Sequence, residues 1–184
     1  KSEREMDRVE TIALKQTEDV LFRTFDKHHR FTSKDFCNIH RVWLGGIYDW
    51  AGTYRNVELT KGNFRFASAI HIPKLMEEFE NGPLRQHTPC IFKPKIRVIK
   101  ALAEVHTELV LIHPFREGNG RVARLLATLM ALQAGLPPLD FHSIHGKKKL
   151  EYFAAVQAGL DRNYKPMEKI FDWVIRDTTS RQKT

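Results

Sequence analysis

Reactive side chains are concentrated in one twelve-residue stretch, His113 to Arg124, which reads His-Pro-Phe-Arg-Glu-Gly-Asn-Gly-Arg-Val-Ala-Arg. Apolar runs with helical periodicity lie on both sides of it, which predicts a helix–loop–helix joint. Pro114 cannot continue the first helix and favours extended geometry in the residue before it, so we expect that helix to end at Ile112 or His113. We interpret the stretch as the active site.

The loop of this joint is suited to binding an anion. Gly118 and Gly120, on either side of Asn119, permit left-handed backbone angles and leave successive N–H groups free to point into one concavity. The second helix is expected to begin between Asn119 and Arg121, and its first N–H groups are unpaired at the positive end of the helix dipole. The sequence therefore predicts a phosphate-binding nest at 118–120.

Four side chains of the stretch have complementary chemistry. Arg121 and Arg124 are three residues apart, so both project from one side of the helix and can bind phosphate oxygens. Glu117 is a hard oxygen ligand suited to Mg²⁺. His113 is the group of the stretch that can take a proton near neutral pH. A Gly-Asn-Gly alone usually forms a turn, and an arginine pair is usually solvated, but their coincidence with a histidine and a carboxylate favours attack on a nucleotide phosphate.

The stretch resembles the signature of Fic-domain proteins (filamentation induced by cAMP), His-x-Phe-x-(Asp/Glu)-Gly-Asn-Gly-Arg-x-x-Arg, and every fixed position is matched. The resemblance implies an all-α fold, a bundle of about seven to eight helices with one β-hairpin flap over the active site. It also implies a nucleotidyltransferase that moves AMP from ATP to a Ser, Thr or Tyr hydroxyl of a target protein and releases pyrophosphate. Relatives that phosphorylate their targets carry a different loop, which this chain does not share.

The resemblance implies a role for each signature residue. His113 deprotonates the target hydroxyl, and Phe115 packs into the core to fix the loop. Glu117 holds Mg²⁺ on the α- and β-phosphates, residues 118–120 form the anion hole, and the two arginines hold the β- and γ-phosphates. In relatives the helix expected here over 147–160 packs against adenine. The ATP-binding residues expected on this basis are Lys61, Gly62, Glu117, Gly118, Asn119, Gly120, Arg121, Val122, Ala123, Arg124 and Tyr152.

One hairpin is predicted, over 57–66. Two short alternating segments, 57–59 and 64–66, flank a turn with glycine and asparagine. An isolated hairpin is weakly stable, so it must pack on helices and can offer a free edge. Fic proteins carry such a flap and register the target by strand addition, which would place Lys61 and Gly62 close to the nucleotide. The alternative is an ordinary structural hairpin.

The rest of the sequence predicts further helices that surround the joint. His40 falls on the apolar face of one of them, and we interpret it as a core histidine rather than a metal ligand. His106 is interpreted either as packing or as an orienter of the loop, and His142-x-x-His145 as part of a loop rather than a metal pair. The helices are expected at 3–25, from Thr32 or Ser33 to Gly45, at 72–83, 96–112, from 119–121 to Gly135, at 147–160 and at 166–175.

The chain has 184 residues and a mass of 21.5 kDa, with 42% hydrophobic residues, which predicts one domain over 1–184. It begins with Lys1 rather than Met, so we expect a fragment of a longer chain. No apolar run reaches the ~20 residues of a membrane span. Cys37 and Cys90 lack CxxC spacing, which favours a reducing compartment, either the cytoplasm or a host cytosol into which the protein is delivered.

A formal charge of +8 and a pI near 9.6 permit nucleic acid, anionic lipid, an acidic protein or a nucleotide as a partner. No basic run is interleaved with stacking aromatics, so we do not expect a nucleic-acid partner, although a basic nucleic-acid-binding module remains the alternative to an enzyme. Because nothing in the loop reads the base, UTP, GTP or CDP-choline are alternative donors.

Many Fic proteins are inhibited by a helix with (Ser/Thr)-x-x-x-Glu-(Gly/Asn), whose glutamate pairs with the second signature arginine. No Ser or Thr of this sequence begins such a motif. A small antitoxin, or a region upstream of Lys1, is therefore expected to supply a glutamate to Arg124, where it would compete with triphosphate. Relatives that remove AMP from targets need the same glutamate.

Overall fold

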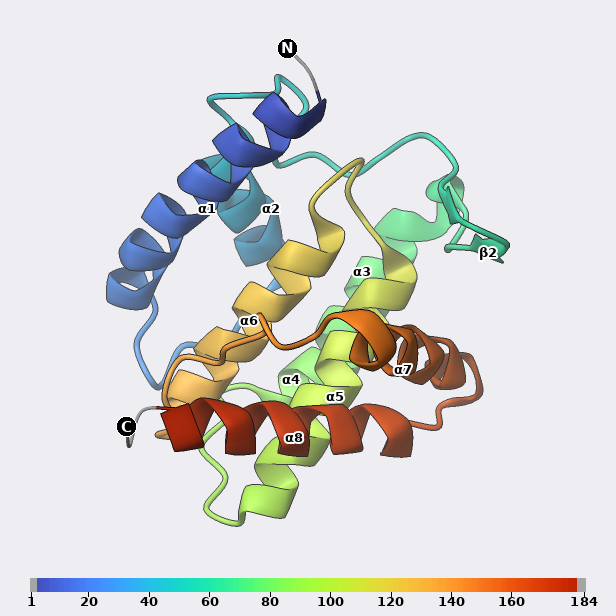
Figure 1. The fold of residues 1–184 in the computed structure, drawn as a ribbon. Coiled ribbons are helices and arrows are strands. Elements are labelled where there is room, and N and C mark those ends of the chain that lie inside the picture. The colour runs from blue at the N-terminus through green and yellow to red at the C-terminus, as the bar shows by residue number, and fades with distance from the viewer. Residues whose placement is uncertain (1–2, 182–184) are drawn as a thin grey trace.

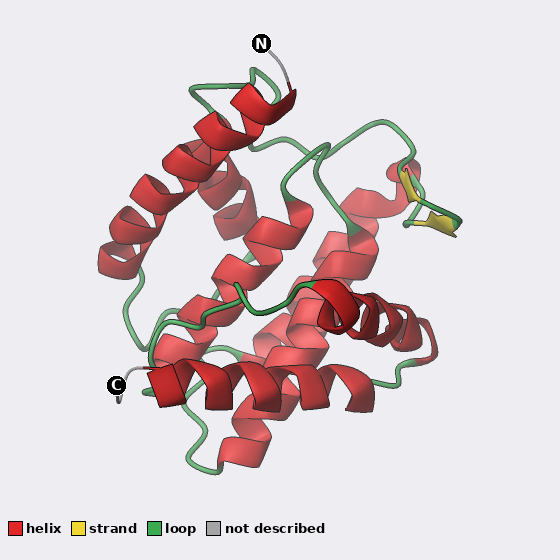
Figure 2. Ribbon diagram, in the orientation of Figure 1, coloured by secondary structure: helices red, strands yellow, loops and turns green. Residues whose placement is uncertain are grey.

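The computed structural model describes residues 3–181, and most of them are helical (Figures 1 and 2). The expected all-α fold with one small hairpin is confirmed. The α-helices are α1 (Glu3–Thr24), α2 (Ser33–Leu44), α3 (Ile72–Phe79), α4 (Arg85–His87), α5 (Lys95–Ile112), α6 (Asn119–Gln133), α7 (Gly146–Ala158) and α8 (Lys165–Arg181). The hairpin consists of β1 (Thr60–Lys61) and β2 (Phe64–Arg65).

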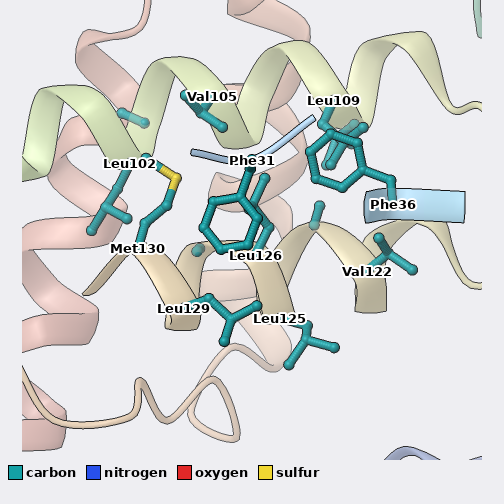
Figure 3. Packing of buried hydrophobic residues seen from close by; sticks show 14 of the residues in the cluster. Phe31, Phe36, Leu102, Val105, Leu109, Val122, Leu125, Leu126, Leu129 and Met130 are labelled. Atoms are coloured by element: carbon teal, nitrogen blue, oxygen red, sulfur yellow. The ribbon is translucent and has the colours of Figure 1, made fainter. Parts of the chain in front are cut away.

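The centre of the fold is the pair α5 and α6, joined by the signature loop (Figure 1). Figure 3 shows Leu102 and Leu109 of α5 and Leu126 and Met130 of α6 in the space between the two helices, with Phe31 inserted among them. All of these side chains are buried. Helix α8 packs across α5, α7 packs against α8 and α5, and α1 lies along α2. The loop at the top of the central pair is thereby held between packed helices.

The helix boundaries follow the local signals in the sequence. Thr32 caps α2 through a capping box: its hydroxyl accepts from the Asp35 N–H and its own N–H donates to the Asp35 carboxylate. Helix α8 was expected to end at Ile175 but reaches Arg181. Two contacts hold the added turns, because Thr178 accepts from the Asp140 N–H (3.0 Å) and Asp177 accepts from a serine hydroxyl. No helix among residues 3–181 has the length and hydrophobicity needed to cross a membrane.

The helix expected at 72–83 is divided by the structure. Helix α3 ends at Phe79, a wide turn follows over Glu80–Leu84, and the single turn α4 comes after it. Gly82 leaves helical geometry at φ −100° and ψ −106°. Pro83, which has no N–H to donate, follows at once. The break was predicted at this glycine and proline, but the return to helix was not.

The hairpin is shorter than predicted. Its strands pair Thr60 with Arg65 and Lys61 with Phe64, so residues 57–59 are not part of a strand. Gly62, at φ 58°, takes the first position of a two-residue turn, where a positive φ is required. One backbone bond continues the ladder beyond the strands, because the Phe66 N–H donates to the Leu59 carbonyl (3.2 Å). Side-chain contacts hold the two residues before it: Arg55 donates to the Val57 carbonyl (2.6 Å), and the Glu58 carboxylate accepts from the Ala69 N–H (2.9 Å).

Candidate active site

A cavity of about 720 Å³ opens at the joint between α5 and α6. The signature loop forms its floor, and the hairpin and α7 form its walls. This arrangement brings together His113, the hairpin residues and the α7 tyrosine, all of which the sequence predicted to belong to the site. Its lining includes Lys61, Gly62, Phe66, His113, Glu117, Gly118, Asn119, Gly120, Arg121, Arg124, Lys149, Tyr152 and Phe153.

Two residues expected to bind ATP do not line this cavity. Val122 and Ala123 are buried in the core, on the opposite side of the first turn of α6. The Val122 N–H is also occupied, because it donates to the Gly118 carbonyl (2.9 Å). Helical periodicity turns the side chains of positions 122 and 123 towards the core when those of 121 and 124 face the cavity, so a contact of Val122 and Ala123 with ATP stays a prediction.

His113 adopts the left-handed conformation at the end of α5, with φ 53° and ψ 60°. The extended geometry predicted from Pro114 was wrong, because the His113 N–H closes the helix by donating to the Leu109 carbonyl (3.1 Å). A non-glycine residue in this region costs about 1–3 kcal/mol. The His113 ring stacks on Phe66 at a centroid distance of 3.6 Å and an interplanar angle of 17°. The ring is thus held by the hairpin.

The orientation of His113 determines its tautomer. Its Nδ1 lies 3.0 Å from the Val110 carbonyl, an acceptor, so Nδ1 carries the proton. Nε2 is then unprotonated and has no hydrogen-bond partner within residues 3–181. Burial lowers the pKa of His113 to about 4, and the positive charges of Arg55 and Lys61 act in the same direction. The imidazole is therefore a neutral base at physiological pH.

Two imidazoles, the buried His106 and the half-buried His113, make the stability of the fold depend on pH. Burial also lowers the pKa of His106 to about 4, from an ordinary value of 6.5. Between pH 6.5 and pH 4 the unfolded state then binds more protons than the folded state. The free energy of unfolding therefore has its full value above pH 6.5 and decreases as the pH falls towards 4. We expect each histidine to lower the free energy of unfolding by about 2 kcal/mol when the pH is lowered from 7.5 to 5. Urea unfolding at the two pH values measures this difference in the free energy of unfolding. His106→Gln should reduce the difference. An unchanged difference in that variant would contradict the contribution of His106.

Phe115 and Asn119 fix the shape of the loop. The Phe115 side chain is fully buried, as predicted, and its ring stacks on His40 at 4.0 Å. The Asn119 side chain accepts from the Phe115 N–H and donates to the Phe115 carbonyl, both at 2.8 Å. Asn119 was expected to face the anion with its glycine neighbours, but its amide is buried in this internal pair. It therefore contributes to the site through its backbone N–H.

His40 is the core histidine that the sequence predicted, and it also supports the loop. Its Nδ1 accepts from the Gly52 N–H (2.8 Å), so Nε2 carries the proton and donates to the Glu117 carbonyl (3.1 Å). Burial lowers its pKa, which keeps this neutral tautomer in place. A histidine on the buried face of α2 thus binds the backbone carbonyl of Glu117 in the signature loop.

The anion nest is present, with one difference from the prediction. Gly118 has φ 80°, and a Cβ there would lie 2.5 Å from the Trp43 ring. Gly120 is helical and does not need a left-handed angle; a Cβ there would meet open space. The N–H groups of Asn119 and Gly120 have no acceptor within residues 3–181, whereas the Gly118 N–H donates to the Glu117 carboxylate (2.7 Å). Two donors at the start of α6 are free for an anion.

The two signature arginines have different surroundings. Arg121 donates to the Glu10 carboxylate (2.5 Å) and to Glu117 (3.2 Å), and its guanidinium lies over the Trp43 ring. Arg124 has no ion pair within residues 3–181 and lines the cavity, and burial lowers its pKa. Both were expected to be available to phosphate. Part of Arg121 is occupied instead, so Arg124 is the more available cation.

Sequence reasoning missed Glu10. Its side chain is 6% exposed and accepts from the Tyr48 hydroxyl (2.6 Å) as well as from Arg121. Through Glu10, the first helix reaches the active site across 111 positions of sequence. The sequence offered one indication, which is that Glu10 lies beside the apolar face of α1. A carboxylate buried there must be paired with a cation or a hydrogen-bond donor.

The α7 wall is tied to the signature helix by His106. The Tyr152 hydroxyl donates to His106 Nε2 (2.8 Å), and His106 Nδ1 donates to the Ala123 carbonyl (3.1 Å). The structure confirms packing, because the ring of His106 is buried against Phe171. Its nitrogens bind Tyr152 of α7 and the Ala123 carbonyl of α6, so a role in orienting the loop stays a prediction. On the facing wall, Lys61 lies over the Phe153 ring at 4.4 Å.

A family model described as the Fic/DOC family matches residues 30–131. The chain belongs to the Fic/DOC family. It is 32% identical over 135 residues to "Protein adenylyltransferase Fic" of Aedes aegypti, which covers 73% of this chain and 26% of that protein. It is 28% identical over 143 residues to "Probable protein adenylyltransferase Fic" of Escherichia coli K12, which covers 76% of this chain and 67% of that protein.

Solved Fic structures share the fold. BepC, a VirB-translocated effector of Bartonella tribocorum solved with bound AMPPNP, matches with a TM-score of 0.74 and 22% identity, covering 94% of this chain and 87% of that chain. A Fic-1 structure from C. elegans matches with a TM-score of 0.75 and 24% identity, covering 98% of this chain and 52% of that chain. The chain therefore corresponds to about a quarter of the length of the Aedes relative and half of the Fic-1 structure.

Proposed function

We propose that this Fic domain transfers AMP from ATP to a Ser, Thr or Tyr hydroxyl of a target protein and releases pyrophosphate. The observation that carries the proposal is the unprotonated His113 Nε2, held beside two free N–H donors and the unpaired Arg124 in one cavity. The names of the relatives from Aedes aegypti and Escherichia coli support the reaction. The AMPPNP bound to BepC supports an adenine nucleotide as the donor.

The arrangement accounts for each event of the transfer. His113 Nε2 takes the proton of the target hydroxyl, and the oxygen attacks the α-phosphorus of ATP. The bond from that phosphorus to the bridging oxygen breaks, and pyrophosphate leaves with the electron pair. The N–H groups of Asn119 and Gly120 stabilise charge on the phosphate oxygens, and Arg124 binds the departing phosphates. Tyr152, on the α7 wall, packs against adenine in this proposal.

Glu117 fits the role of a magnesium ligand. Its side chain is 57% exposed at the cavity, and Oε1 accepts from the Gly118 N–H and Arg121, so Oε2 remains for a cation. Mg²⁺ prefers one or two carboxylates together with phosphate oxygens and water, which matches a single carboxylate beside a triphosphate. Mg²⁺ would neutralise charge on the phosphates, and Glu117 would hold it there.

Two macromolecular contacts belong to the same proposal. A target segment pairs with the free edge of the hairpin, whose exposed strands offer unpaired backbone groups. A small antitoxin, or sequence upstream of Lys1, supplies a glutamate to Arg124, which has no ion pair within residues 3–181. Titrating ATP binding with such a partner tests this, because a competing carboxylate raises the apparent Kd for ATP.

We propose that the protein acts in the cytosol of the cell that produces it or of a host cell. Fractionation of these cells and detection of the protein in each fraction test the location.

Intact-mass spectrometry of candidate acceptor proteins tests the reaction. Acceptors are incubated with the domain, Mg²⁺ and each of ATP, UTP, GTP and CDP-choline. We expect the mass of one AMP moiety to be added with ATP, and the addition to be lost when EDTA replaces Mg²⁺. The heat-denatured domain is the control for chemical modification. If the domain prefers another nucleotide, that nucleotide is the donor in place of ATP. If no donor adds mass to any protein of a lysate, the domain is not a transferase.

A further inference from the structure

Arg55 is a buried arginine whose charge is not matched by an ion pair in the described part of the chain. It is 2% exposed and follows the turn after α2. Its guanidinium is satisfied by backbone carbonyls instead. Nε donates to His113 (2.7 Å), Nη1 to Val57 (2.6 Å), and Nη2 to Ala67 (2.6 Å) and more weakly to Ile112 (3.4 Å).

These four carbonyls belong to two segments that are distant in sequence. Val57 and Ala67 flank the hairpin on either side, at its base. Ile112 and His113 form the end of α5, which we call the catalytic turn together with Pro114. The backbone N–H of Arg55 also donates to the Pro114 carbonyl (2.8 Å). One residue therefore binds both legs of the hairpin and the peptide groups that carry the base.

The physical chemistry of the contact requires an arginine. Burying a guanidinium is costly unless its donors are paired, and here four of its five N–H groups donate to backbone carbonyls. The last carbonyls of α5 lie at the negative end of its dipole, which favours a cation there. The donors diverge in a rigid planar fork, so they can reach carbonyls on two segments at once, whereas a lysine presents its donors from one point.

The hairpin cannot fix its own position. It contains two residue pairs, and a hairpin of that size is not stable by itself. Two ring contacts also join it to the site, the stack of Phe66 on His113 and the contact of Lys61 with the Phe153 ring. Both are contacts between side chains, whereas Arg55 binds the backbone carbonyls at the base of the hairpin and those of the catalytic turn.

We propose that Arg55 is a positioning residue that fixes the base of the hairpin against the catalytic turn. A target strand paired with the hairpin then presents its hydroxyl at a constant distance from His113. This inference rests on the proposed function for the target strand. The fixed geometry between hairpin and turn is a property of the free protein and can be measured without any transfer.

Arg55→Lys tests the inference because it keeps the charge and removes the fork. Hydrogen–deuterium exchange of the free protein should be roughly tenfold faster in the hairpin and in residues 113–117, with α5 and α6 unchanged. The Kd for ATP should stay within about twofold of wild type, while kcat/KM for an acceptor found by mass spectrometry falls roughly tenfold. Arg30→Lys is the matched control, since Arg30 also donates to a distant carbonyl, that of Arg85, away from the cavity.

Two results would overturn the inference. One is a folded Arg55→Lys variant whose hairpin exchanges at the wild-type rate. The other is a loss of ATP affinity in parallel with transfer, which would show general damage to the site. If Arg55→Lys does not fold, Arg55→Gln, which keeps a donor of similar reach towards His113, is measured with the same readouts. Faster hairpin exchange without any AMP transfer in wild type would retain the positioning role and reject the proposed reaction.

Discussion

His113→Ala is expected to lower kcat/KM for AMP transfer by roughly 10²–10⁴-fold, the usual contribution of a general base. The imidazole acts on the target hydroxyl and does not donate to the phosphates, because its Nδ1 proton is used by the Val110 carbonyl. The Kd for ATP should therefore change little. Steady-state transfer kinetics and calorimetric titration with ATP measure the two quantities.

A matched control is available for this variant. His142→Ala removes a histidine whose side chain is 96% exposed and lies outside the cavity, so transfer should continue at the wild-type rate. His113→Gln is made in parallel, because glutamine keeps a polar group but cannot act as a base near neutral pH. Wild-type transfer by both His113 variants, or loss of ATP binding and folding together with transfer, would contradict the role of base.

Phe115→Ala is expected to lower the free energy of unfolding by about 3–5 kcal/mol, the range for large-to-small changes of buried aromatic residues. The ring is 0% exposed and stacks on His40, so its removal leaves a cavity beneath the signature loop. Because His40 holds the Glu117 carbonyl, the loop should also lose its geometry. Urea unfolding at neutral pH measures the loss of stability, and ATP titration measures the loss of binding.

Ile91→Ala is the control for the stability measurement. Its side chain is 52% exposed, so truncation should change the free energy of unfolding by less than about 1 kcal/mol. A loss below about 1 kcal/mol in Phe115→Ala would mean that the loop relaxes into the vacated space. Full ATP affinity in that variant would show that the loop keeps its shape without the ring.

Much of the candidate site could be predicted because its parts are local. The base, the carboxylate, the nest and the arginines lie within twelve residues, and a turn of helix fixes their relative positions. The same local logic predicted the ends of α5 and α6. It did not show that the side chains of Val122 and Ala123 are buried, because the packing of the helices decides which side of α6 faces the core.

The sequence by itself determined the type and spacing of the reactive groups, because a short signature can interact with phosphate in few ways. Only the tertiary structure decided what holds them. Glu10 meets Arg121 across 111 positions, and Arg55 meets His113 across 58. A side chain that binds distant backbone carbonyls cannot be recognised from a periodicity or a motif. The packing of the helices determines which carbonyls it meets, and its neighbours in the chain do not.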